Sequence, residues 1–375
     1  MANISLTWGA EFAIPTSNHT AAGSPEVGRS VEPFCSLCCC GLLNRTLTVV
    51  FMVSLAFAIV VGNVVTLSVF MQTRQSRTPQ GYLKVSLAIA DMMVGIVVVP
   101  FSVYTEISIM VTSTPPVWYH GGPTILTDDL SSPWQPCMLI GPVFAGSTFV
   151  SISTIFLMTL ERSVAILWPL HKDTLVTRRR TLLLIFASWT GSFVLAVAPL
   201  VLSKKLTLAY NECSRMCNYV LIIVGLQVPD DFNILLLFPA FDFILLVGTL
   251  AVNILSFTSI CQNTRRRKLL SEGGERLEAN AGSCTHRPSF SDIKAAKTIG
   301  ILTFAFTACF SPIAVFVLGN VVGYTWCNFS FFAFWILAGN SCCNVIIYSM
   351  RDHRFRKGVS LLFHKDHSPP HSEKS

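Results

Sequence analysis

Seven long apolar runs divide the chain, and each is long enough to cross a membrane as a helix. A hydrocarbon core about 30 Å thick takes ~20 helical residues. Five runs lack Asp, Glu, Lys and Arg, while Asp91 and Asp242 interrupt the second and fifth. Such a chain is suited to sensing, transport or intramembrane catalysis. The runs cover roughly residues 47–70, 85–105, 137–160, 181–203, 232–260, 298–320 and 329–350.

The composition favours membrane helices over a soluble fold. The 375 residues are 52% hydrophobic and 13% charged, whereas soluble domains carry about 25% charged residues. In lipid the backbone is satisfied only in helices or closed barrels, and runs of this length favour helices. The sequence therefore predicts an all-α membrane protein, a bundle of seven transmembrane helices. Transporter-like internal repeats and the HExxH and GxSxG motifs of enzymes are lacking, so we expect neither a transporter nor an enzyme.

The basic residues gather in alternate connections, which predicts the orientation of the chain. With the N-terminus outside, five of the 27 lysine and arginine residues lie outside and the rest inside. Because this is the positive-inside bias, the net charge of +7 indicates topology and not binding to nucleic acid. We expect a plasma-membrane protein with an extracellular N-terminus and a cytoplasmic C-terminus. Four glycosylation sequons map outside, at Asn3, Asn18, Asn44 and Asn328.

The runs and their flanks divide the chain into four parts. Residues 1–46 form a polar extracellular tail, 47–350 the transmembrane domain, 351–363 an amphipathic helix and 364–375 a cytoplasmic tail. The amphipathic helix is predicted because apolar residues recur at i, i+4, i+7 and i+8 from Phe355, with basic flanks. That pattern is typical of a helix lying on the lipids of the inner leaflet.

Two connections carry expectations of their own. The outer loop 204–231 contains a ten-residue apolar stretch, too short to span, which we interpret as a hairpin or lid over the mouth of the bundle. The inner loop 261–293 is polar and basic. We expect it to be partly disordered, since it offers little apolar surface to bury.

Cys137 and Arg162 mark the two ends of the third run. They are 25 residues apart, about 37 Å of helix, so Cys137 is expected at the outer mouth and Arg162 at the inner one. Either Cys217 or Cys213, in the loop before the fifth run, can reach Cys137. We favour Cys217 slightly because it is nearer the apolar stretch, and Cys213 stays the alternative. Such a disulfide would fasten the lid to the third helix.

Every run also carries a short marker. In order they are Gly62-Asn63-Val64, Leu87-Ala88-Ile89-Ala90-Asp91, Glu161-Arg162-Ser163, Trp189, Pro239, Phe306 to Pro312, and Asn344 to Tyr348. Through these markers the chain resembles the rhodopsin-like (class A) G-protein-coupled receptors over about residues 47–363. The resemblance implies a receptor that answers an extracellular ligand and activates a heterotrimeric G protein by outward movement of its sixth helix.

The acid of the second run is expected to sit in a polar group at mid-membrane, where ionisable residues are costly and usually functional. A carboxylate with hydroxyl and amide oxygens suits a hard cation, and the resemblance implies a sodium ion here, with no other cofactor. The alternative is a protonated Asp91 hydrogen-bonded to asparagine without an ion. The expected members are Asp91, Asn63, Ser151, Asn340, Ser341 and Asn344.

The resemblance also implies a switch at the inner end of the third helix. Arg162 would pair with Glu161 and with Asp292 at rest, and would turn toward the G protein on activation. The alternative is an interfacial arginine that reaches the lipid headgroups. Pro169 and Leu170 would contact the G protein, or else form a simple helix stop with a membrane-facing leucine.

The sixth and seventh helices supply the rest of the expected switch. Pro312 kinks the sixth helix, with Phe306 and Phe310 packed at the pivot and Tyr348 retained in the seventh. Three positions depart from the family pattern. They are Phe310 in place of Trp, Val345 in place of Pro, and Val247 in place of Tyr. These departures keep open the alternative of a non-signalling or constitutively biased scaffold with the receptor fold.

The ligand is not named by the sequence. In aminergic receptors an Asp stands seven residues after the cysteine of the third helix, where this chain has Phe144. A classical amine is therefore disfavoured. Phe144 and Phe310 are expected to line an apolar ligand pocket.

Overall fold

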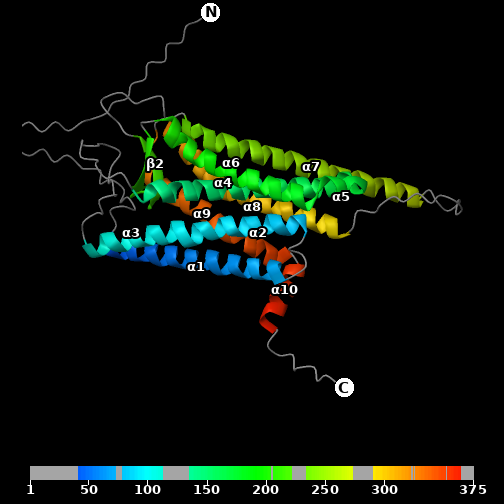
Figure 1. Ribbon diagram of the computed structural model, residues 1–375, viewed down its shortest axis with the longest axis horizontal. Coiled ribbons are helices and arrows are strands. Elements are labelled where there is room, and N and C mark those ends of the chain that lie inside the picture. Colours follow the sequence, from blue (N-terminus) through cyan, green and yellow to red (C-terminus); the bar gives the residue numbers. More distant parts are fainter. Residues whose placement is uncertain are drawn as a thin grey trace, which may run out of the picture. The chain divides into compact units, whose positions relative to one another are not determined.

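The computed structural model describes residues 41–72, 78–112, 135–203, 206–221, 234–272, 290–321, 324, 326–351 and 353–364. Within these ranges, seven helical segments are long and apolar enough to cross a membrane, and they form the predicted seven-helix bundle (Figure 1). The spans are α1 (Leu42–Gln72), α2 (Pro79–Met93) continued by α3 (Val99–Thr112), α4 (Cys137–Leu167), α6 (Arg178–Leu202), α7 (Leu237–Glu272), α8 (Phe290–Val321) and α9 (Cys327–Arg351).

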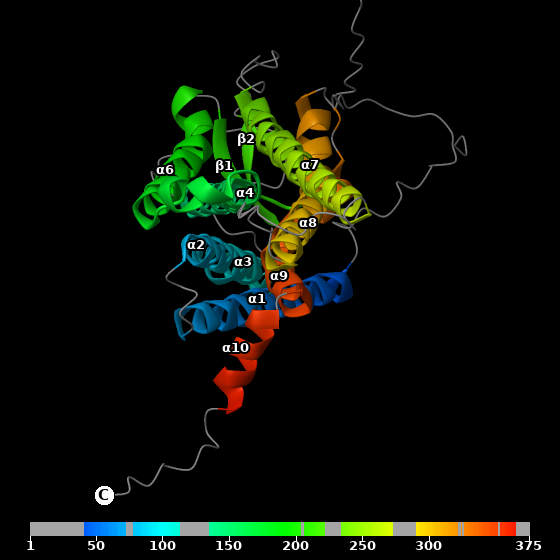
Figure 2. The same cartoon turned by 90° about the vertical axis from the view of Figure 1, so that its right-hand side faces the viewer.

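α4 is the central helix of the bundle, since it packs against α2, α6, α7 and α8. It is buried on most of its circumference, as Figure 2 illustrates in the view turned by 90°. Small residues let its neighbours approach closely. A Cβ added at Gly146 would lie 2.9 Å from the ring of Phe193 on α6. On the same face of α6, one turn earlier, Trp189 stacks on Phe193, and its indole donates a hydrogen bond to Ser86 of α2 at 2.8 Å.

The second span is interrupted by a π-helical turn, η2 (Val94–Val98), between α2 and α3. Such turns insert one extra residue and are frequent at functional sites. The chain passes close to α1 here, because a Cβ at Gly95 would lie 2.7 Å from Cγ2 of Ile59. This turn was not predicted. It begins three residues after Asp91 and changes the faces that the later residues of the span present.

A β-hairpin stands in the connection between α6 and α7, where a hairpin or lid was predicted. Strands β1 (Leu206–Asn211) and β2 (Met216–Leu221) pair antiparallel, with Tyr210 opposite Cys217. β1 packs on α4, where a Cβ added at Gly141 would lie 2.6 Å from Leu208. The rest of the apolar stretch, residues 222–228, lies outside the part of the chain that the structure describes.

Several helices extend beyond the apolar runs. α7 continues to Glu272 and α8 begins at Phe290, so the predicted bounds of the inner loop, 261–293, are wrong at both ends. The expectation of partial disorder falls on residues 273–289, which lie outside the part of the chain that the structure describes. Apolar length marks only the stretch in contact with lipid. Arg, Lys, Leu and Glu, which dominate 265–272, have high helix propensity and continue the backbone hydrogen bonding past the membrane. For the same reason α1 begins at Leu42 and not near residue 47.

The predicted amphipathic helix is present as α10 (His353–His364), which contacts α1 and α9. Phe355 is its buried anchor and lies against the rings of Phe70 and Tyr348. Arg356 and Lys357 stay exposed on the opposite face. Short segments η3 (Pro169–His171) and α5 (Lys172–Leu175) join α4 to α6.

Candidate functional site

The predicted polar core forms around Asp91, which is 1% exposed. Asn344 of α9 donates a hydrogen bond from Nδ2 to Asp91 Oδ2 at 2.6 Å, and Ser151 of α4 donates to Oδ1 at 3.3 Å. Asn63 of α1 donates to the backbone carbonyl of Ser341 at 2.9 Å. Residues from α1, α2, α4 and α9 are thus tied together at one depth of the bundle.

The remaining predicted members of the core lie on α9. Ser341 contributes its backbone carbonyl to Asn63, and Asn340 is buried beside it. The carboxylate, hydroxyl and carbonyl oxygens in this group are the ligand type that sodium prefers. Both carboxylate oxygens of Asp91 accept hydrogen bonds from protein donors. An ionised carboxylate has about four lone-pair positions, so a cation can bind Asp91 beside these donors.

The C-terminal end of α4 carries the arginine that was predicted to act as a switch. Arg162 Nε lies 3.3 Å from Glu161 Oε2, and both side chains are largely shielded. Ser163, which follows them, is hydrogen-bonded to Ser256 of α7 at 2.9 Å between the two hydroxyl oxygens. Asp292, the other predicted partner of Arg162, is in the first turn of α8, but its side chain lies outside the described part of the structure.

The segment after α4 presents an apolar side chain to its surroundings. Leu170, in η3, is 79% exposed, while nothing is described of the Pro169 side chain. An exposed leucine at the end of the bundle that carries Arg162 and α10 could insert into a partner. We call this end the α10 end, and it lies opposite the β-hairpin in Figure 1.

Tyr348 is fully buried near the α10 end, with a partner that sequence reasoning missed. Its ring meets Phe70 edge-on, and the Lys84 Nζ lies 4.9 Å from its ring centroid and 5.0 Å from that of Phe70. Lysine over an aromatic face is stabilised by the ring quadrupole, and more so where water is excluded. Lys84 follows a short inner loop in the sequence. Its charge was therefore counted only among the basic residues that indicate the inner side of the membrane.

The aromatic rings predicted for the pivot and for the ligand pocket lie in two separate stacks. Phe306 and Phe310 stack on each other within α8, with ring centroids 6.0 Å apart, and Pro312 lies inside the same helix. Phe144 stacks on Phe334 of α9, with centroids 6.2 Å apart. Phe144 and Phe310 are both buried, but in different stacks.

Two disulfides fasten the hairpin to the bundle at the end opposite α10, which we call the disulfide end. Cys217, the favoured partner, is bonded to Cys137, while Cys213 is bonded to Cys327 at the start of α9. The second bond was not predicted. The sequons Asn44 and Asn328 lie in the first turns of α1 and α9 and not in the preceding connections. Asn3 and Asn18 fall outside the residues that the structure describes.

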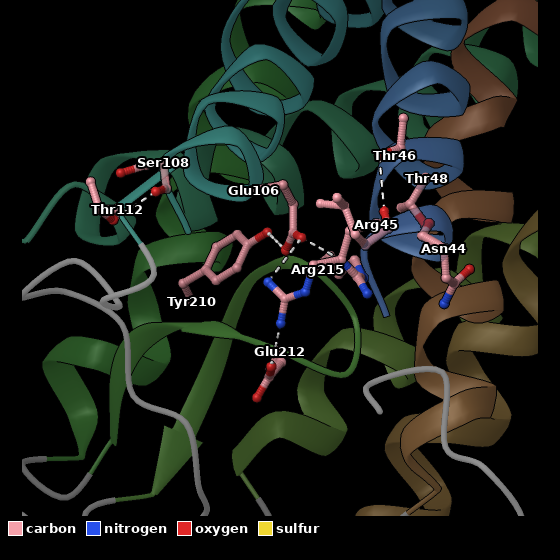
Figure 3. Close-up of polar contacts among 11 residues, drawn as sticks. Asn44, Arg45, Thr46, Thr48, Glu106, Ser108, Thr112, Tyr210, Glu212 and Arg215 are labelled. Atoms are coloured by element: carbon pink, nitrogen blue, oxygen red, sulfur yellow. Dashed lines mark hydrogen bonds and ion pairs between the residues drawn. The ribbon is translucent and has the colours of Figure 1, made fainter. Parts of the chain in front are cut away.

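Sequence reasoning also missed a charged cluster at the disulfide end, shown in Figure 3. Glu106 of α3 is 1% exposed and forms an ion pair with Arg215, which is also 1% exposed. Tyr210 donates its hydroxyl hydrogen to Glu106 Oε1 at 2.9 Å. Arg45 Nη1 lies 3.7 Å from Glu106 Oε2, and its Nη2 donates to Glu212 Oε1 at 3.0 Å. We refer to these five residues as the Glu106 cluster.

The sequence held a weak signal for this cluster. Glu106 directly follows the second apolar run, and it continues the buried stripe of Val99, Ser102 and Thr105 at helical spacing. A helical projection extended past the last apolar residue would have placed the carboxylate inside the bundle. The four charged members were instead assigned to solvated outer segments.

The comparisons with known proteins agree with this geometry. Residues 122–348 match the family model "7 transmembrane receptor (rhodopsin family)". Trace amine-associated receptor 13c of Danio rerio is 28% identical over 84% of this chain and 86% of its own length. Neuropeptide receptor 22 of Caenorhabditis elegans is 24% identical over 86% of this chain and 70% of its own. A probable glycoprotein hormone G-protein coupled receptor of Anthopleura elegantissima is 25% identical over 83% of this chain but 30% of its own. With its seven spans, and with the Asp91 polar core and the Glu161–Arg162 ion pair in the expected helices, the chain belongs to the rhodopsin family of seven-transmembrane receptors and is a G-protein-coupled receptor.

Proposed function

We propose that this receptor lies in the plasma membrane and carries a signal from a ligand at its disulfide end to a heterotrimeric G protein at its α10 end. The observation that carries the proposal is the Glu161–Arg162 ion pair at the end of α4 near the exposed Leu170. One continuous helix joins this pair to Cys137 and hence to the hairpin. Movement at one end of the bundle can therefore be transmitted to the other through α4 and its neighbours.

The proposed moving part is α8. Pro312 lacks a backbone N–H and so removes one hydrogen bond from the interior of this helix. The stacked rings of Phe306 and Phe310 lie within the two turns before it. A change in their packing would alter the bend at Pro312 and swing the α10 end of α8 outward, opening the space beside Arg162 to the G protein.

Arg162→Ala tests the proposed coupling. Basal nucleotide exchange is measured with membranes that contain the receptor and each class of G protein in turn. Wild type is expected to exceed receptor-free membranes with at least one class, and Arg162→Ala is expected to fall to the receptor-free level, because the group that would contact the G protein is gone. Arg179→Ala, an exposed arginine of α6, is the matched control and should keep wild-type exchange.

The same measurement separates the receptor from its alternative. Flat responses from wild type and Arg162→Ala with every class, at equal surface amounts, would favour the non-signalling scaffold. Wild-type exchange retained in Arg162→Ala would remove the arginine from its proposed role. Phe310 and Val345 depart from the family pattern, and these departures are the reason to test for a non-signalling scaffold.

We infer that the disulfide end faces the cell exterior. Both disulfides lie at this end, and disulfides persist in oxidising compartments. The bias of the basic residues supports the same orientation. An epitope tag at the N-terminus should be stained by antibody on intact cells, and a tag at the C-terminus only after permeabilisation. Staining of both tags on intact cells would overturn the inferred orientation.

The ligand class is not singled out by the relatives. Their names refer to trace amines, a neuropeptide and a glycoprotein hormone, three ligands of different chemistry. Phe144 takes the place of the carboxylate that holds the amine in aminergic receptors, which argues against a small amine bound at α4. Any carboxylate that recognises a cation at the disulfide end must come from another helix.

A further inference from the structure

The second half of the turn between β1 and β2, Ser214 and Arg215, is buried, which is unusual for a loop. Loops normally run over the surface, because their backbone polar groups need partners. Here Ser214 is 0% and Arg215 1% exposed. The Ser214 carbonyl accepts a hydrogen bond from the Trp335 indole of α9 at 2.9 Å. The neighbouring Cys213 is bonded to Cys327, so the turn is held against α9 from two positions.

The backbone of the turn is bent to bring Arg215 inward. Arg215 has a φ of 54°, in the left-handed region, which is uncommon for a residue other than glycine. Such conformations persist where the surroundings enforce them, and they gather at functional positions. The Arg215 backbone N–H also donates to the Asn211 carbonyl at 2.8 Å, which closes the turn. The guanidinium thereby reaches Glu106 on α3, 109 residues away in sequence.

The surroundings of the Glu106 carboxylate have the character of a cation site. The Tyr210 hydroxyl donates a hydrogen bond to Glu106 Oε1. Glu106 Oε2 is left to accept from a positive group. Water is excluded, since Glu106, Tyr210 and Arg215 are each 1% exposed or less. In such a place an unpaired carboxylate is strongly unfavourable, so the site demands a cation. The chain supplies that cation from its own turn, and Arg215 Nη2 has no hydrogen-bond partner among the described residues.

We propose that Glu106 and Tyr210 form a binding site for a guanidinium or amidinium group, and that Arg215 fills this site as a ligand tethered to the chain. Free cations are then excluded from wild type, because the tethered guanidinium is present at a high effective concentration. Removal of the Arg215 side chain vacates the position in contact with Glu106, since Arg45 Nη1 stays 3.7 Å away and its Nη2 is bonded to Glu212. The vacated position is selective for small planar cations. The proposal does not rest on G-protein coupling, because occupancy is measured through the thermal stability of the receptor.

The test uses the full-length receptor in lipid nanodiscs, with ethylguanidinium as the probe and ethylurea as its uncharged counterpart. Arg215→Ala is expected to lower Tm by about 5–10 °C, since one partner of a buried pair is lost. Ethylguanidinium at millimolar concentration is expected to raise the Tm of this variant saturably, by about 2–4 °C. Ethylurea should have no effect on it, and wild type should respond to neither compound.

Two control variants locate the effect. Arg45→Ala removes the other guanidinium of the Glu106 cluster, which is 20% exposed and pairs with Glu212, but it leaves Arg215 in place. It should not respond to ethylguanidinium. The double variant Glu106→Gln with Arg215→Ala lacks the carboxylate and should not respond either. If Arg215→Ala fails to reach the membrane, Arg215→Gln, which keeps most of the side-chain volume, takes its place in the same measurement.

The outcomes decide the proposal. A saturable rise in Tm that requires the loss of Arg215 and the presence of Glu106 supports it. An equal rise in wild type, or in the double variant, would show that ethylguanidinium acts elsewhere and would overturn it. So would the absence of any response in both Arg215→Ala and Arg215→Gln.

Discussion

Loss of the Cys137–Cys217 disulfide is expected to cost more stability than any other single change considered for this receptor. The bond closes a loop with a sequence separation of 80 residues. The chain-entropy relation gives about 4.5 kcal/mol for a loop of this length. The loop spans α4, α6 and β1. Without the bond, the unfolded chain gains many more conformations over this length, and its entropy rises. A fall in Tm on the order of 10 °C follows.

The double variant Cys137→Ser with Cys217→Ser is the cleanest form of this test. Each single variant leaves a thiol free to exchange with the Cys213–Cys327 bond, whereas the double variant does not. Since all three variants remove one and the same bond, the double variant should be no less stable than either single variant. Thermal melting of purified receptor, with antibody staining of cells for surface amount, measures the effect.

Cys261 provides the matched control, because it is a free, exposed cysteine of α7. Cys261→Ser should leave Tm unchanged within about 1 °C, as surface substitutions without special contacts usually do. A double variant as stable as Cys261→Ser would contradict the expectation. It would mean that the hairpin is held by the Cys213–Cys327 bond and by packing of Leu208 on α4 alone.

The seven spans could be predicted because lipid imposes a strong and local rule on sequence. Each span needs ~20 apolar residues, and this requirement can be seen without any knowledge of tertiary contacts. The polar core was predictable for a related reason. Asp91 interrupts an apolar run, and a costly acid at that depth must find polar partners. The structure supplies them in Asn344 and Ser151.

The Glu106 cluster could not be predicted in the same way. Glu106 and Arg215 are 109 residues apart, and each taken alone resembles a solvated charge beside a span. Their burial depends on how the hairpin turn enters the bundle, which is a tertiary event. The Cys213–Cys327 pairing has the same origin, since cysteine spacing does not specify connectivity. The length of α7 was missed because hydropathy marks the lipid boundary and not the end of helical hydrogen bonding.

Asp91→Ala is expected to destabilise the receptor by about 2–4 kcal/mol. Asn344 Nδ2 would lose its acceptor and stay buried, which costs about 1–3 kcal/mol, and the missing carboxyl group leaves a small cavity that costs about 1 kcal/mol more. Ser151 is affected less, because its hydroxyl can still donate to the Ser147 carbonyl at 3.0 Å. Thermal melting in sodium-free buffer measures this structural part of the effect without any ion.

We propose that a sodium ion binds wild type at Asp91, and the same variants test it. Sodium at ten times its Kd would stabilise the receptor by about 1.4 kcal/mol. Replacing choline chloride with sodium chloride at constant ionic strength should therefore raise the Tm of wild type, and Asp91→Asn should abolish the rise because the charge that attracts the ion is gone. Asp242→Asn is the matched control. Asp242 is also a fully buried acid of a span. It lies on α7, whereas Asn344 lies on α9 and Ser151 on α4.

The two measurements together separate the two interpretations of the polar core. If Asp91→Ala is destabilised and wild type responds to sodium while Asp91→Asn does not, the ion binds at Asp91. If Asp91→Ala is destabilised but wild type melts at the same temperature in sodium and choline, Asp91 acts through Asn344 and Ser151 alone and the sodium proposal fails. A sodium response that survives in Asp91→Asn but disappears in Asp242→Asn would place the ion at Asp242 on α7 instead.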